Sequence, residues 1–172
     1  MRSFSRYTAA APLLFFGALF PLSAQAATET DTFEVLLTIE DACAVTAGSG
    51  SAIDLGAQAA SQTDIASSGT FTVNCSNSTP YYIGLAPSNG STSGAGELAS
   101  GTTTDKVPYQ LRSATGGAGT IWGNTATSSA VGNGVAGTGE GSDQSYTVYV
   151  TVPDANFTPA DYKDTVTVTV NF

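Results

Sequence analysis

Few residues of this 172-residue chain could carry out chemistry. The sequence has no histidine, which excludes Ser-His-Asp and Cys-His nucleophile systems and the usual zinc ligand sets. Asp161 and Asp164 have the spacing of an acid pair, but they flank the start of an expected strand and have no partner for catalysis. The glycine-rich runs lack a Gly-x-Gly-x-x-Gly pattern with a following helix, so no phosphate site is expected. We therefore expect no catalytic residue, no bound metal and no cofactor, in a protein that is not an enzyme.

Residues 1–26 have the pattern of a secretion signal. Arg2 and Arg6 precede an apolar run over residues 9–22, and Ala24-Gln-Ala26 forms a cleavage-site pattern. The apolar run is short for a membrane span. A mature chain beginning at Ala27 would contain 172 − 26 = 146 residues, which is enough for one domain.

The mature chain is acidic and has two cysteines. Only Lys106, Arg112 and Lys163 remain as cations against fourteen acids, a net charge of 3 − 14 = −11. An acidic surface argues against nucleic acids and anionic membranes as partners. Because an exported protein meets an oxidising compartment, we expect Cys43 and Cys75 to form one disulfide.

Alternation of apolar and polar residues dominates the rest of the chain, and no segment has a convincing helical period. The clearest predicted strands cover residues 32–39, 69–76, 80–86, 107–111, 145–152 and 165–172. Short strands are also expected at 51–56 and 120–123, a loop or weak edge strand at 87–104, and a loop at 124–142. About seven or eight short strands separated by turn residues predict an all-β, immunoglobulin-like sandwich.

Two strands with strong alternation lie at the two ends of the mature chain. In the first, Phe33, Val35, Leu37 and Ile39 share one face. In the last, the residues that share a face are Val166, Val168, Val170 and Phe172. Alternation alone leaves open whether the first strand packs into its own domain or completes the sheet of a neighbour.

A set of motifs along the mature chain resembles the spore coat protein U domain family, whose members include subunits of Csu-type archaic chaperone-usher pili. These motifs are Cys43 after the N-terminal strand, Ile53-Asp-Leu-Gly56, Val73-Asn-Cys75, Val107-Pro-Tyr-Gln-Leu111, Ile121-Trp-Gly123 and the ending Asp161-Tyr-Lys-Asp-Thr-Val-Thr-Val-Thr-Val-Asn-Phe172. The resemblance covers essentially all of the mature chain, and the ending together with the paired cysteines is its most specific part.

The resemblance implies an incomplete immunoglobulin-like β-sandwich that is completed by a donor strand from a neighbouring subunit. Residues 27–41 would be the donor-strand extension, with Phe33, Val35, Leu37 and Ile39 as the donor face, and 42–172 the pilin domain. Val166, Val168, Val170 and Phe172 would border the acceptor groove. The implied partners are identical or related pilin subunits, a periplasmic chaperone and an outer-membrane usher. The chain would be a shaft or adaptor subunit of a cell-surface pilus that supports attachment and biofilm formation.

The alternative is a self-contained secreted β-sandwich that binds a ligand through its polar loops. In that case residues 32–39 would complete the domain's own sheet. Trp122 is the residue that could serve such a module as a sugar platform, but packing is the simpler interpretation of this side chain.

Overall fold

The structure is a computed structural model that describes residues 27–48, 52–117 and 119–172. It divides the chain into one unit of residues 1–37 and a second of residues 38–172. In the first unit, residues 27–37 form neither helix nor strand, and their side chains are exposed. The expected secretion signal, residues 1–26, lies outside the described residues.

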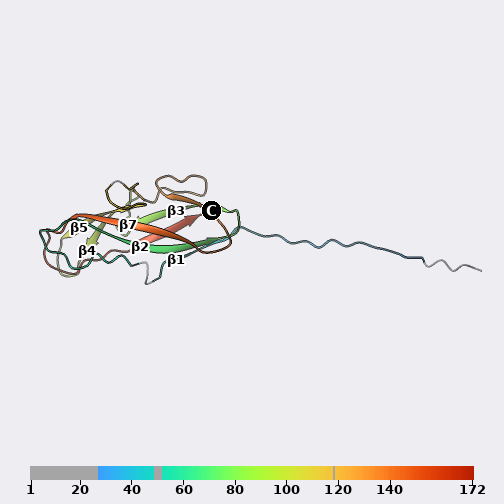
Figure 1. The fold of residues 1–172 in the computed structure, drawn as a ribbon, viewed down its shortest axis with the longest axis horizontal. Coiled ribbons are helices and arrows are strands. Elements are labelled where there is room, and N and C mark those ends of the chain that lie inside the picture. The colour runs from blue at the N-terminus through green and yellow to red at the C-terminus, as the bar shows by residue number, and fades with distance from the viewer. Residues whose placement is uncertain (1–26, 49–51, 118) are drawn as a thin grey trace, which may run out of the picture. The chain divides into compact units, whose positions relative to one another are not determined.

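The second unit is built from strands (Figure 1). Within the described residues they are β1 (Cys43–Thr46), β2 (Thr63–Cys75), β3 (Pro80–Pro87), β4 (Ala95–Ala99), β5 (Lys106–Arg112), β6 (Val135–Thr138), β7 (Gln144–Asp154) and β8 (Val166–Asn171). All strand pairs are antiparallel. Over the same residues, no helix has the length and apolar character needed to span a membrane.

The strands form two sheets that pack face to face. One sheet has the order β1-β2-β7-β5-β4, and the other has the order β6-β3-β8. Their inward side chains make one core, whose largest fully buried members are Trp122, Tyr81, Ile83, Leu85, Leu111 and Val73. The all-β sandwich predicted from alternation is confirmed, and Trp122 is a core residue whose indole Nε1 donates to the Ile83 carbonyl at 2.9 Å.

The expected disulfide is present between Cys43 and Cys75. These two residues face each other directly across β1 and β2, so the bond joins neighbouring strands of the same sheet. Of the four β1 residues, Cys43 alone is partly buried, and the other three are exposed. The strand therefore contributes little side-chain packing of its own.

Four expectations about strands need correction. Residues 32–39, the first predicted strand, form no strand in the structure. Residues 52–56 form no strand, and Ile121 makes only an isolated bridge with Arg112. The expected loop 124–142 contains β6, which pairs with β3. This strand lacks large alternating side chains; it forms because Gly137 leaves room for the ring of Tyr81, which a Cβ at this position would overlap.

Candidate functional site: an open groove beside the last strand

The last strand lies at the edge of its sheet. β8 is hydrogen-bonded to β3 in a register that runs from Tyr82 opposite Asn171 to Pro87 opposite Val166. Its other side has no strand neighbour in the described part of the chain. An edge of this kind offers backbone N–H and C=O groups to a further strand.

A groove opens between the two sheets beside this edge. Its central cavity, of about 330 Å³, takes Val166 and Val168 from β8 and Leu85 from β3. The facing sheet and the segment before β2 complete the wall with Phe71, Tyr109, Leu111, Val148, Val150, Ile53 and Leu55. An apolar trough of this composition suits a row of apolar side chains entering from a neighbouring strand.

The groove continues into a second cavity of about 780 Å³. The two cavities share lining residues, among them Ile53, Leu55, Leu98 and Asp164. The second cavity extends toward Phe157 and the segment before β8. The open space is therefore longer than the hydrogen-bonding edge of β8 itself.

The four predicted acceptor residues occupy different positions along β8. Val166 and Val168 line the central cavity. Val170 is half-buried and packs against the core, and Phe172 lies beyond the end of the strand, half exposed. The first two are thus the members of the set that face the groove.

The predicted donor residues are apolar and exposed. Phe33, Val35 and Leu37 are 87%, 84% and 83% exposed in the first unit, and Ile39 at the start of the second unit is 81% exposed. Leu36, on the opposite face of the same extended segment, is 84% exposed. Large exposed apolar side chains are therefore concentrated in this segment.

Asp164 is the charged residue among the described residues that line the central cavity. Burial opposes its ionisation, but hydrogen bonds from Ser88 Oγ, from Tyr109 Oη at 2.6 Å and from the Thr165 amide outweigh it. The pKa of this carboxyl therefore lies below its ordinary value. Burial, followed by the contact with Asp164, raises the pKa of the Tyr109 hydroxyl.

The two acids considered as a catalytic pair have separate surroundings. Asp161 is exposed, whereas Asp164 is half-buried and holds the groove wall through its hydrogen bonds. No group of three or more His, Cys, Asp or Glu side chains in the described ranges could hold a metal ion. The chemistry of this site is that of apolar contact and backbone hydrogen bonding.

Sequence reasoning missed the part of the groove wall opposite β8. Residues 107–111 were expected to form a strand, but alternation does not say that Tyr109 and Leu111 lie beneath an open edge. Ile53 and Leu55 carry a weaker signal, a two-residue period that the structure uses for packing without a hydrogen-bonded neighbour.

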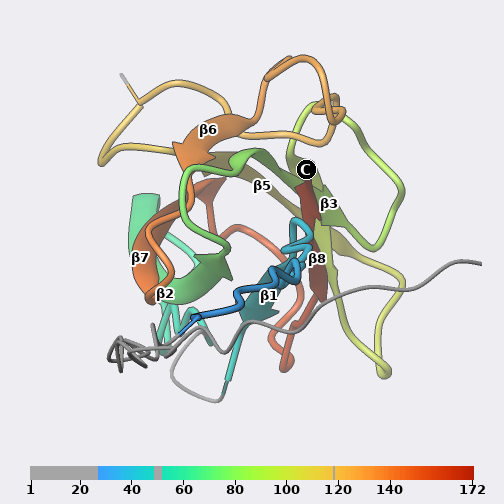
Figure 2. The ribbon, with the colours of Figure 1, turned by 90° about the vertical axis from the view of Figure 1, so that its right-hand side faces the viewer.

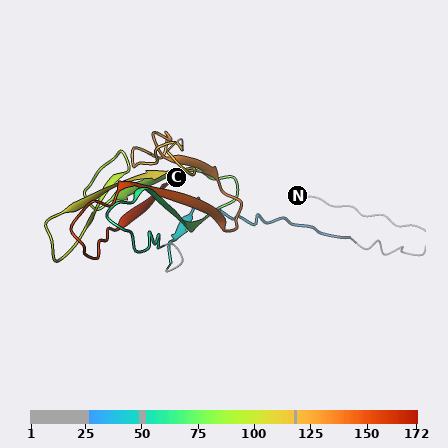
Figure 3. The same ribbon diagram turned by 60° about the vertical axis from the view of Figure 1, so that its left-hand side comes forward.

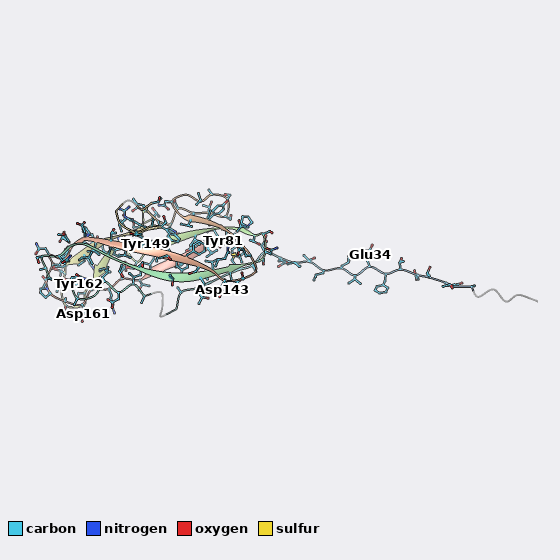
Figure 4. All side chains as sticks on the ribbon, viewed as in Figure 1. Glu34, Tyr81, Asp143, Tyr149, Asp161 and Tyr162 are labelled. Atoms are coloured by element: carbon cyan, nitrogen blue, oxygen red, sulfur yellow. A yellow bond between two sulfur atoms is a disulfide. The ribbon has the colours of Figure 1, made fainter. Side chains whose placement is uncertain are left out.

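The two ends of the sandwich are distinct. Asp143, whose carboxylate accepts from Asn74 beside the disulfide, lies toward one end, and Asp161 and Tyr162 lie toward the other (Figure 4). β1 starts and β8 finishes at the first of these ends, where the C-terminus also lies (Figure 3). We call this the entry end, and the end with Asp161 the far end.

The chain is fixed to the entry end just before β1. The amide of Ala42 donates to Ser76 Oγ at 3.1 Å, and Asp41 accepts from Thr79 Oγ1 at 2.5 Å. β1 and β8 approach each other in the second unit (Figure 2). The extension therefore joins the domain close to the side on which the groove opens.

Comparison with known proteins gives a family and a fold. Among curated proteins, none has a significantly matching sequence. In a crystal structure of the CsuC-CsuE chaperone-tip adhesion subunit pre-assembly complex from archaic chaperone-usher Csu pili of Acinetobacter baumannii, one chain has a similar fold, with a TM-score of 0.51 and 18% sequence identity. The alignment covers 78% of this chain and 40% of that one, so this chain spans less than half of its length. The sequence model of the spore coat protein U domain matches residues 29–169, and the chain therefore belongs to the spore coat protein U domain family.

Proposed function

We propose that this protein is a structural, non-enzymatic subunit of a surface pilus that polymerises by donor-strand exchange. Residues 33–39 of one copy would enter the groove of the next copy and pair with the free edge of β8. The observation that carries the proposal is the unpaired edge of β8 above an apolar groove, in a chain that also has an exposed apolar strand sequence.

The energy of such a contact is large enough to hold a fibre. Burial of Phe33, Val35, Leu37 and Ile39 would contribute about 1.5–3 kcal/mol for each side chain, before the cost of ordering the extension. The backbone hydrogen bonds to β8 add to this contribution. The sum is comparable with the whole stability of a small domain, about 5–15 kcal/mol.

The topology favours an antiparallel donor strand. The extension leaves its own domain at the entry end, so residue 39 must lie near the entry end of the donor subunit. An antiparallel donor would finish at the far end of the acceptor, which leaves the acceptor's entry end free to donate in turn. A parallel donor would finish at the acceptor's entry end. The donor's domain would then lie where the acceptor's own extension leaves. Only the antiparallel direction repeats head to tail.

The proposed assembly route follows from the same open edge. An exposed β8 would invite aggregation in the periplasm, so a chaperone would have to cover the groove until the subunit reaches an outer-membrane usher. The similar fold was solved in a chaperone-subunit complex, which supports this route. With a pilin domain, residues 42–172, and a donor segment, residues 27–41, the chain would act as a shaft or adaptor subunit of a pilus used in attachment and biofilm formation.

Two adjacent leucines provide a matched test. Leu37→Arg should abolish polymers because it places a charge in the apolar groove, whereas Leu36→Arg on the opposite face should leave them intact. Both variants should still bind the chaperone. Polymers would be measured as a denaturant-resistant ladder in gels of unheated material and by electron microscopy.

The proposal fails if the Leu37→Arg variant forms fibres as readily as the Leu36→Arg variant. Removal of residues 27–40 gives an independent test. A truncated domain that is a stable, cooperatively melting monomer would instead favour the self-contained binding module, since it would not need a further strand.

A further inference from the structure

We propose that the free subunit can close its own groove with its own extension, in the direction opposite to that used in the fibre. In this closed monomer, residues 33–39 would lie parallel to β8 of the same chain. The inference rests on the proposed function to the extent that it uses the same segment and the same groove. It adds a second state, which competes with assembly.

The position at which the extension joins the domain allows this closure. Ala42 is bonded to Ser76 at the entry end, and Asn171, the last residue of β8, pairs with Tyr82 at that same end. Residues 33–39 precede Cys43, which lies at the entry end. If they fold back along the groove, their chain direction must therefore run from the far end toward the entry end. β8 runs in the same direction, so the two strands would be parallel.

The connection has a suitable length. Residues 40–42 would form the loop of a hairpin between residues 33–39 and β1, and hairpin loops of about 2–5 residues are common. An antiparallel arrangement within the same chain is excluded, because residues 39–43 are too short to connect it. It would place Ile39 at the far end, about 17 Å away for a strand as long as β8. The four steps from Ile39 to Cys43 reach at most about 14 Å.

Closure would bury the same side chains in reversed order. With Leu37 opposite Val168 in either state, Val35 would lie beside Val166 in the closed monomer, and Ile39 would take that place in the fibre. A parallel ladder is slightly less stable for each residue than an antiparallel one. The closed state gains instead from a short tether, which gives an effective concentration of the order of millimolar. Closure therefore dominates in dilute subunits and gives way to exchange in the fibre.

Two cysteine pairs distinguish these states in the purified chain from Ala27. Under mild oxidation at low protein concentration, Val35→Cys with Val166→Cys should link within one chain and give a monomer of increased mobility on non-reducing gels. Ile39→Cys with Val166→Cys should link between chains and give a ladder at high concentration. Leu36→Cys with Val166→Cys is the control, because Leu36 is on the other face and should form neither link.

Each outcome decides one hypothesis. Absence of the intramolecular link in the Val35/Val166 pair, with a ladder from the Ile39/Val166 pair, would overturn the closed monomer and leave the proposed function standing. The reverse result would overturn antiparallel exchange and keep the closed monomer.

Melting of the unsubstituted chain gives a second readout. Closure predicts a transition above that of the chain without residues 27–40 and independent of concentration, whereas a transition that rises with concentration from the truncated value would exclude it.

Discussion

The hydroxyl of Tyr109 donates a 2.6 Å hydrogen bond to the carboxylate of Asp164 across the groove wall. Tyr109 lies on β5 in one sheet, and Asp164 lies two residues before β8 in the other. Ser88, just after β3, donates to the same carboxylate. This bond therefore ties the start of the open-edged strand to the sheet that faces it.

Removal of this hydroxyl should loosen the groove without changing its shape. Tyr109→Phe should lower the free energy of unfolding by about 1–3 kcal/mol, because a partly buried hydrogen bond to a charged group is lost. The measurement is chemical denaturation of the purified chain. Tyr149→Phe on β7 is the matched control, since the structure shows no hydrogen bond for the Tyr149 hydroxyl within the described ranges. Equal losses in both variants would contradict the assigned role of Tyr109.

The same carboxylate predicts how stability depends on pH. The pKa of Asp164 is lowered in the fold relative to its ordinary value of 3.8. A lowered pKa gives stability that is fully present above the unfolded-state value and is lost as the pH falls through the folded-state value. Asp164→Asn should therefore be less stable than the parent chain near neutral pH, and the difference should shrink below about pH 4.

The comparison needs denaturation curves at several pH values for both chains. The pKa of Asp105 is also lowered, by a hydrogen bond from the Thr158 backbone, so the parent's own acid transition contains more than one group. The difference between parent and Asp164→Asn isolates one of them. A difference that stays constant with pH would show that Asp164 acts through packing rather than through its charge.

Gly96 should be essential for the position of Tyr109. A Cβ at Gly96 would overlap the ring of Tyr109, so Gly96→Ala must displace that ring from Asp164. Gly101→Ala is the control, because a Cβ at Gly101 meets nothing within 4 Å. We expect a loss of stability of about 1–3 kcal/mol for the first substitution and almost none for the second. The double variant Gly96→Ala with Tyr109→Phe should lose less free energy of unfolding than the sum of the two single losses. A double-mutant cycle of this pair would measure the difference.

Alternation was sufficient to predict most of the strands but not the shape of the groove. The inward faces of β5, β7 and β8 follow from large apolar residues at every second position. Which strand ends up at an open edge depends on the strand order β6-β3-β8, which no local pattern specifies. The terminal strands could be recognised as donor and acceptor candidates only because a family resemblance supplied the missing pairing.

Two kinds of residue remained beyond prediction for physical reasons. Ile53 and Leu55 pack into the groove from a segment that has no hydrogen-bonded neighbour, so the pattern was mistaken for a strand. From the sequence, Asp164 was expected only to lie in the turn before the last strand, without a partner for its carboxylate. Its partners, Tyr109 and Ser88, are distant in sequence and meet it only after the two sheets have packed.

The disulfide should matter mainly for β1. The side chains of Ala44, Val45 and Thr46 are exposed, so this strand is held by its hydrogen bonds to β2 and by Cys43. The bond closes a loop with a sequence separation of 32 residues. In the chain-entropy model such a loop is worth about 3–4 kcal/mol.

Replacement of Cys43 and Cys75 together by serine should therefore release β1 before the rest of the sandwich unfolds. Hydrogen exchange of the Ala44, Val45 and Thr46 amides would detect this as a loss of protection, while amides in the centre of β7 remain protected. Uniform loss of protection over β1 and β7 would instead mean that the disulfide stabilises the whole domain cooperatively.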